Sequence, residues 1–76
     1  MNNSRRKSIV SLMESLESLK DDLESILNEE QEAFDNLPEG IQNSDRGETM
    51  ENAISALEEV RYSMDSALES LETAME

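Results

Sequence analysis

The chain contains no cysteine and no histidine, which removes the residues on which most metal and redox sites depend. Without cysteine there is neither a disulfide nor a thiolate ligand, and without histidine the commonest metal ligand is also missing. A domain of 76 residues buries only about 60% of the surface of its unfolded chain, and so small a domain usually needs a disulfide, a bound metal or a second chain. The composition therefore favours a homo-oligomer, and we expect no cofactor.

Aromatic residues and long apolar runs are also scarce. The chain has one Phe, one Tyr and no Trp, so few bulky side chains are available to close the interior of a monomer. No stretch approaches the roughly 18 consecutive apolar residues of a membrane span, and Ser11, Glu14 and Glu17 interrupt the apolar stretch after the basic N-terminus. We therefore expect a cytoplasmic protein with no signal peptide and no membrane contact.

Positive charge is the third scarcity. Six basic residues stand against nineteen acidic ones, which gives a formal net charge of −13, and Arg5, Arg6 and Lys7 make up half of the six. Such an excess of negative charge repels nucleic acids and anionic membranes and attracts cationic surfaces. The expected partner is another protein with a basic surface, without direct binding of nucleic acid.

The apolar residues that are present follow a heptad pattern in both halves of the chain. From Ile9 to Ile26 they recur at alternating steps of three and four, which places Leu or Ile at heptad positions a and d. From Met50 to Ala74, position a holds Met or Leu and position d holds mainly Ala. Further apolar residues at position e widen both stripes to the breadth of a bundle helix. Large residues at d in the first half and small ones in the second predict two helices that pack closely.

The segment between the two patterns contains residues that end and begin helices. Pro38 disfavours a helical conformation of the residue before it, and Gly40 offers a permissive turn position. Asn43 or Ser44 can cap the following helix. One long continuous helix is the competing architecture, which the Pro and Gly argue against. We predict a single all-α domain over residues 1–76, an antiparallel, coiled-coil-like two-helix hairpin with helices at about 5–36 and 45–75 and a loop at about 37–44.

A two-helix hairpin leaves much of so wide an apolar stripe exposed, so a second copy is expected to cover it. We predict a homodimer in the form of a four-helix bundle. The predicted oligomer interface consists of apolar residues at positions a, d and e of both helices: Leu12, Leu16, Leu19, Leu23, Ile26, Leu57, Val60, Met64, Leu68 and Leu71.

Carboxylates are the only abundant reactive groups, and their arrangement does not favour an enzyme. Acid and base pairs need two carboxyl groups that converge on a cleft, whereas nearly all acids here occupy outward heptad positions. Glu30, alone at an a position, is interpreted as a residue that fixes register, with a metal ligand as the less favoured alternative. The segment from Asp45 to Glu48 lacks the spacing of a calcium loop and indicates a turn and a helix cap.

The isolated cations and aromatics have plain interpretations. Arg46 is expected to pair with a neighbouring acid, and the basic N-terminal segment with acids at the end of the second helix, such as Glu72. Aromatic residues are enriched at the energetic centres of interfaces. Tyr62, at an outward position, is a better candidate than Phe34 for such an anchor, with a solvent-facing Tyr as an equal alternative.

The acidic residues point to a sharper function. A rod of about 45 Å carrying the charge of two chains would hold one negative charge per roughly 1.7 Å, close to duplex DNA. The outward acids would then stand in for phosphates; the alternative is a charged surface that only keeps a small bundle soluble. The predicted partner-binding face comprises Glu14, Glu17, Asp21, Asp22, Glu24, Glu58, Glu59, Asp65, Glu69 and Glu72.

The middle and second half of the chain also resemble a group of viral proteins. The stretch from Asn28 to Ala74, in which Glu29–Gly40 leads through Ser44–Glu48 into Met50–Ile54, is similar to short acidic helical proteins encoded by bacteriophages and prophages. The resemblance implies a phage accessory protein of unassigned role in the cytoplasm of the host cell. It makes inhibition of a host or defence protein an expectation and transfers no functional residue.

Two functions follow from these features. The first is a non-enzymatic acidic binding module that mimics the charge of DNA, occupies a basic surface of another protein and binds less well in high salt. The second is a structural or assembly component that binds partner helices through its apolar stripe, with binding insensitive to salt. An enzyme is the least favoured class.

Overall fold

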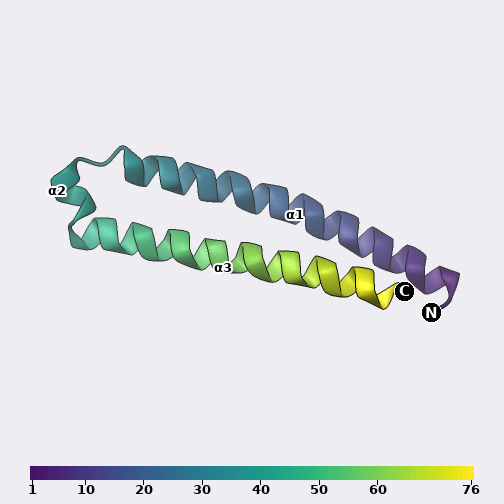
Figure 1. Cartoon of the computed structure of the whole chain (residues 1–76). Coiled ribbons are helices and arrows are strands. Elements are labelled where there is room, and N and C mark those ends of the chain that lie inside the picture. Colours follow the sequence, from purple (N-terminus) through teal and green to yellow (C-terminus); the bar gives the residue numbers. More distant parts are fainter.

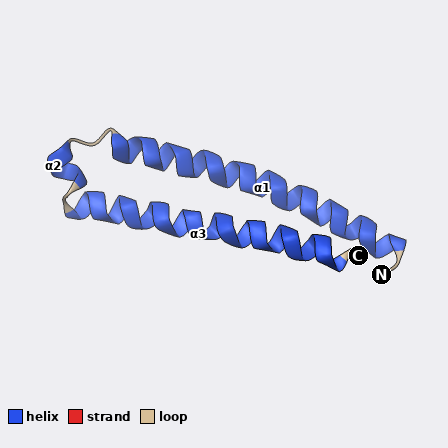
Figure 2. Cartoon of the chain, viewed as in Figure 1, coloured by secondary structure: helices blue, strands red, loops and turns tan.

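The computed structural model describes all 76 residues. They form three helices, α1 (Asn3–Asp35), α2 (Glu39–Gln42) and α3 (Asp45–Ala74), and no strand (Figure 2). Helices α1 and α3 run antiparallel side by side, with α2 at one end and both termini at the other (Figure 1). The prediction of two long helices in an all-α hairpin is confirmed, and the short helix α2 within the connection was not predicted. The molecule is a rod of 58 × 15 × 11 Å.

Helix α1 begins with a side-chain cap, and α3 does not. The side-chain oxygen of Asn2 accepts a hydrogen bond from the backbone N–H of Arg5 at 2.8 Å, which satisfies one of the free donors of the first turn. Ser44 occupies the cap position of α3, but its hydroxyl donates back to the carbonyl oxygen of Ile41 instead of accepting from the helix. Asp45 and Glu48 lie in the first turn of α3, where negative charge favours the helix dipole.

The connection is held against the two long helices by one amide and one glycine. The side-chain amide of Gln42 donates to the carbonyl oxygen of Phe34 at 3.0 Å and so ties α2 to the end of α1. Gly47 is buried in the first turn of α3, directly against the backbone of Gln42. A Cβ at Gly47 would lie within 3.0 Å of three backbone atoms of Gln42, so the close approach of α2 to α3 requires glycine there.

The seam between α1 and α3 is built from heptad positions a and e, not from a and d. Every a and e residue of both helices is buried or half-buried, and every d residue is exposed. The only buried apolar side chains are Leu23 (8% exposed), Leu27 (6%) and Ile54 (6%). Position d of α3 is mostly Ala, whereas the apolar residues at position e are large in both helices, namely Met13, Leu27, Phe34, Ile54 and Leu68. Closure on a and e therefore buries more apolar area. Neither long helix contains a segment apolar and uncharged enough to cross a membrane.

Candidate interaction surfaces

The hairpin has two broad faces, one on each side of the seam. Residues follow one another at 100° around a helix, so positions b and d lie about 80° to either side of the centre of an a/e seam. In an antiparallel pair, the same heptad position of both helices falls on the same side. We call the side of position b the acidic face and the side of position d, with the neighbouring position g, the apolar face. The acidic face carries Glu17 and Glu24 of α1 and Glu51, Glu58, Asp65 and Glu72 of α3.

The ten acids of the predicted partner-binding face do not share one surface. Five of them lie on the acidic face, which also includes Glu51, an acid that the prediction omitted. The others occupy different positions around the helices, because only the seam decides which way each outward position turns. Glu14, Asp21 and Glu69 are at position f along the outer border of the acidic face, Glu59 is at position c on the outer edge of α3, and Asp22 is at position g on the apolar face.

Two cations lie at the seam edge of the acidic face. The ammonium of Lys20 pairs with the carboxylate of Asp65, which is the only ion pair in the structure and joins the two long helices. The hydrogen bond to Asp65 raises the pKa of Lys20 above its ordinary 10.5, against an opposing effect of desolvation. The guanidinium of Arg61 lies over the ring of Tyr62, with its central carbon 5.7 Å from the ring centroid. Tyr62 is 62% exposed and therefore accessible to a partner.

The N-terminal basic residues and Arg46 do not form the local ion pairs that the sequence suggested. No carboxylate lies within ion-pair distance of Arg5, Lys7 or Arg46. Arg6 instead donates from its Nε to the carbonyl oxygen of Met75 at 3.0 Å, where it satisfies a free acceptor at the end of α3. A backbone carbonyl at the C-terminal end of α3, and not an acidic side chain, thus accepts the hydrogen bond of Arg6.

The length of the rod lowers the charge density expected for a dimer. Two chains side by side would carry twice the net charge of −13 along 58 Å. That is one charge per about 2.2 Å, compared with about 1.7 Å for duplex DNA. The density is below the value expected from the sequence because the longer α1 and the connection make the rod longer than the roughly 45 Å assumed. It remains of the same order as that of a nucleic acid.

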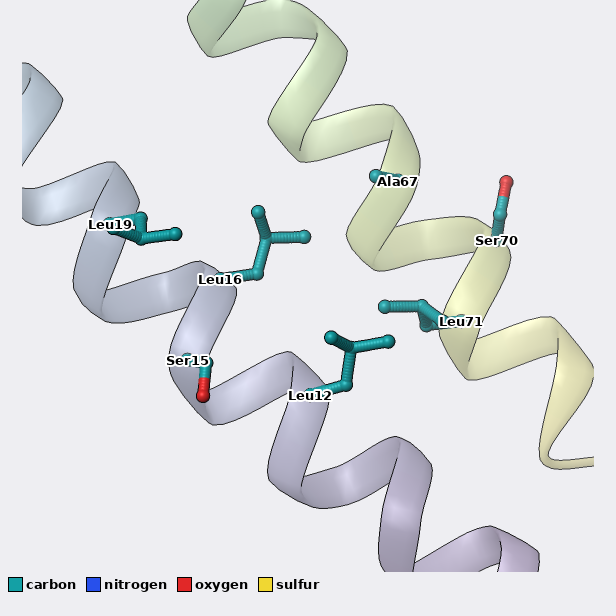
Figure 3. A pocket seen from close by; sticks show the side chains of 7 residues that line it. All are labelled: Leu12, Ser15, Leu16, Leu19, Ala67, Ser70 and Leu71. Carbon is teal, nitrogen blue, oxygen red and sulfur yellow. The ribbon is translucent and has the colours of Figure 1, made fainter.

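The apolar face exposes a row of large aliphatic side chains. Leu12, Leu19 and Ile26 of α1 are each between 53% and 56% exposed, and Val60 of α3 is 44% exposed. In the half of the hairpin near the termini this face is hollowed into a groove of about 460 Å³. The groove is shown in Figure 3, where Leu12 and Leu71 point toward one another across the gap and the hydroxyls of Ser15 and Ser70 point away from it. Its lining residues are Leu12, Ser15, Leu16, Leu19, Ala67, Ser70 and Leu71.

The ten residues of the predicted oligomer interface separate into two groups. Four of them, Leu12, Leu19, Ile26 and Val60, are exposed on the apolar face and remain available to another chain. Six lie in the seam within the hairpin, where α1 and α3 cover one another, although Leu16 and Leu71 also line the groove. Those six are Leu16, Leu23, Leu57, Met64, Leu68 and Leu71.

Glu30 is half-buried at its a position in the seam. No group of three carboxylates comes close enough to hold a metal ion. A second hollow, near the termini, is lined by Asn3, Arg6, Lys7 and Val10. No known protein family, no curated protein and no solved structure matches the chain.

Proposed function

We propose that this protein is a non-enzymatic binding module that works as a homodimer and places its acidic face on a basic surface of another protein. The observation that carries the proposal is the distribution of charge. Six carboxylates line one side of the hairpin at heptad position b, and Asp65 alone among them is paired with a cation. A basic surface that normally binds a nucleic acid is the kind of partner that such a row fits.

Long-range attraction would govern this binding. Complementary charge raises the rate of association, and its range falls from about 10 Å at 0.1 M salt to about 3 Å at 1 M. Affinity for the partner is therefore expected to fall steeply with salt. On the basis of the resemblance to phage proteins, we propose that the partner is a host or defence protein and that the module inhibits it in the cytoplasm of the host cell.

The test is capture from bacterial lysate with the immobilised protein, washed in parallel at low and high salt, with retained proteins identified by mass spectrometry. Two double variants locate the binding charge. Glu17→Gln/Glu72→Gln removes two exposed carboxylates from the acidic face. Glu32→Gln/Glu59→Gln removes two exposed carboxylates from the outer edges at position c and so changes the net charge equally.

We expect a basic nucleic-acid-binding protein that elutes with salt and whose affinity falls about fivefold, roughly 1 kcal/mol, with the first variant. The second variant should bind nearly as well as the parent. Equal losses in both variants would mean that only net charge matters. Affinity unchanged between low and high salt would contradict the proposal.

A second candidate function, the binding of a partner helix in an assembly, is supported by the apolar face. The exposed row of Leu12, Leu19 and Ile26 is the type of surface that a partner helix covers in an assembly. In that case the acids only keep the protein soluble. The same capture experiment separates the two functions, because a partner held through this row resists salt and is lost when Leu19 becomes polar.

A further inference from the structure

The apolar face is exposed, and nothing within the chain covers it. Leu12, Leu19 and Ile26 follow one another at intervals of seven residues, so they form a straight row along α1. Each is more than half exposed, and the groove of about 460 Å³ opens beside the row. A contiguous exposed apolar surface of this kind marks an interaction site.

The exposed area of the chain is large enough to contribute to an interface of standard size. The chain exposes 5502 Å², whereas a compact monomer of its mass, 8.6 kDa, exposes about 4,700 Å² by the usual scaling. The excess of about 800 Å² equals what one subunit contributes to an interface of standard size. One side of the rod measures 58 × 15 Å, roughly 870 Å² in projection, so covering a single face accounts for the excess.

Charge determines which face a second copy could approach. A chain with a net charge of −13 repels its own kind most strongly at the acidic face. The groove on the opposite side is lined by leucines, alanine and serines without any ionised group. The hydroxyl of Ser15 is already bonded to the carbonyl oxygen of Ser11. Contact between two apolar faces would bury this row and leave both acidic faces outward.

Charge also distinguishes the two ways of pairing these faces. Arg5 occupies the d position one heptad before Leu12, and its side chain has no hydrogen-bonding or ion-pair partner in its own chain. Glu29, exposed at position g, borders the other end of the same row. A dimer with both connections at one end would place the two basic N-termini together. A dimer with connections at opposite ends places the basic end of one copy on the acidic end of the other.

We propose that a second copy of this chain covers the apolar face, with the two connections at opposite ends and a two-fold axis near Leu19. The equal spacing of the row makes it self-complementary about that axis. Leu12 of one copy lies opposite Ile26 of the other, the two Leu19 side chains meet, and Arg5 lies opposite Ala33 of the second copy, about one helical turn from its Glu29. This arrangement rests on the function proposed above only for the expectation of a dimer.

The first test is sedimentation equilibrium of the full chain, with Leu19→Gln and a matched control, Val10→Gln. Val10 is 43% exposed on the same helix but lies at position b, on the other side. The parent should sediment at twice 8.6 kDa. Leu19→Gln should raise the dissociation constant of the dimer at least about 100-fold, because two leucines return to water, and Val10→Gln should change it by less than about threefold.

Circular dichroism shows whether the Leu19→Gln chain keeps its helices. A monomeric parent, or equal effects of the two variants, would overturn the proposal. If the monomeric parent also retains a salt-resistant partner from lysate, and Leu19→Gln abolishes that binding, then a helix of another protein covers the apolar face. None of these outcomes touches the salt-sensitive binding by the acidic face, which is read in the capture experiment.

The second test addresses orientation by reversing charges. Arg5→Glu should weaken the dimer by about threefold to tenfold, because two symmetric contacts with Glu29 become repulsive, and Arg5→Glu/Glu29→Arg should restore it to within about threefold of the parent. Lys7→Glu is the control, since it changes the net charge equally at position f, away from the apolar face. A double variant no better than Arg5→Glu alone would overturn the opposite-end arrangement.

Discussion

The half of the hairpin next to the connection differs from the half next to the termini. All four buried residues, Leu23, Leu27, Gly47 and Ile54, lie between the connection and the Lys20–Asp65 ion pair. The groove lies on the other side of that pair, where α3 offers Ala67, Ser70 and Leu71. The chain thus buries side chains completely enough to form a core only in the half next to the connection. In the half next to the termini, the residues between the helices are at most half-buried. A core of three buried side chains makes stability depend on individual residues of the connection half.

The largest expected effect comes from truncating the core of the connection half. Leu27→Ala should lower the free energy of unfolding by about 2–5 kcal/mol, because removing a buried leucine, 6% exposed, leaves a cavity. Leu68→Ala is the matched change, since Leu68 occupies the same heptad position in the terminal half and is only half-buried. Leu68→Ala should lower the free energy of unfolding by clearly less than Leu27→Ala. Urea unfolding followed by circular dichroism at one fixed protein concentration measures both, and equal losses would contradict the difference between the halves.

Glycine substitutions test how the connection closes. Gly47→Ala should lower the free energy of unfolding by about 1–3 kcal/mol, because the new Cβ overlaps the backbone of Gln42 and forces α2 away from α3. Gly40→Ala provides the control, since a Cβ there meets nothing within 4 Å. That change should be neutral or stabilise by up to about 1 kcal/mol through the unfolded chain. Thermal unfolding of the two variants and the parent measures both effects. A Gly47→Ala variant as stable as the parent would show that α2 can move away from α3 without loss of stability.

The heptad pattern was sufficient to predict the hairpin but not the rotation of its helices. Apolar residues occupy a, d and e in both halves, and two helices can cover only two of these three positions. The choice of a and e follows from a comparison of areas across both helices, in which Ala53 and Ala67 at d compete with Ile54 and Leu68 at e. The periodicity of one helix alone does not show which pair of positions buries more apolar area against the other helix.

The same rotation of the helices explains why the sequence could not assign each acid to one side of the hairpin. It identified the acids as outward-facing, but Glu17 at b and Asp22 at g fall on different sides only after the seam is known. The contact of Gly47 with Gln42 was not predictable either, because a glycine in the first turn of a helix looks like a turn residue. The cap by Asn2 carries a recognisable signal, an Asn just before a helical segment, and it extends α1 beyond its predicted start.

The smallest expected effect concerns the ion pair that separates the two halves. The hydrogen bond to Asp65 raises the pKa of Lys20 in the folded chain above its ordinary 10.5. A raised pKa means that the folded state holds the proton more tightly than the unfolded chain. The stabilisation is therefore complete below about pH 10 and is lost as the pH rises through the folded pKa of Lys20. The pair is partly exposed, so we expect a smaller change than for either substitution above.

Asp65→Asn isolates this contribution because all other groups that titrate in alkali are the same in both proteins. Melting temperatures of the parent and the variant should differ between about pH 7 and pH 10 and converge above it. A difference that stays constant beyond that range would mean that Asp65 acts through packing or through its general charge and not through Lys20. Lys20→Met should abolish the pH dependence of the difference, because the titrating partner is then absent. If Lys20→Met instead leaves the convergence unchanged, Asp65 is coupled to a different group that titrates in alkali, and the Lys20–Asp65 pair does not account for the pH dependence.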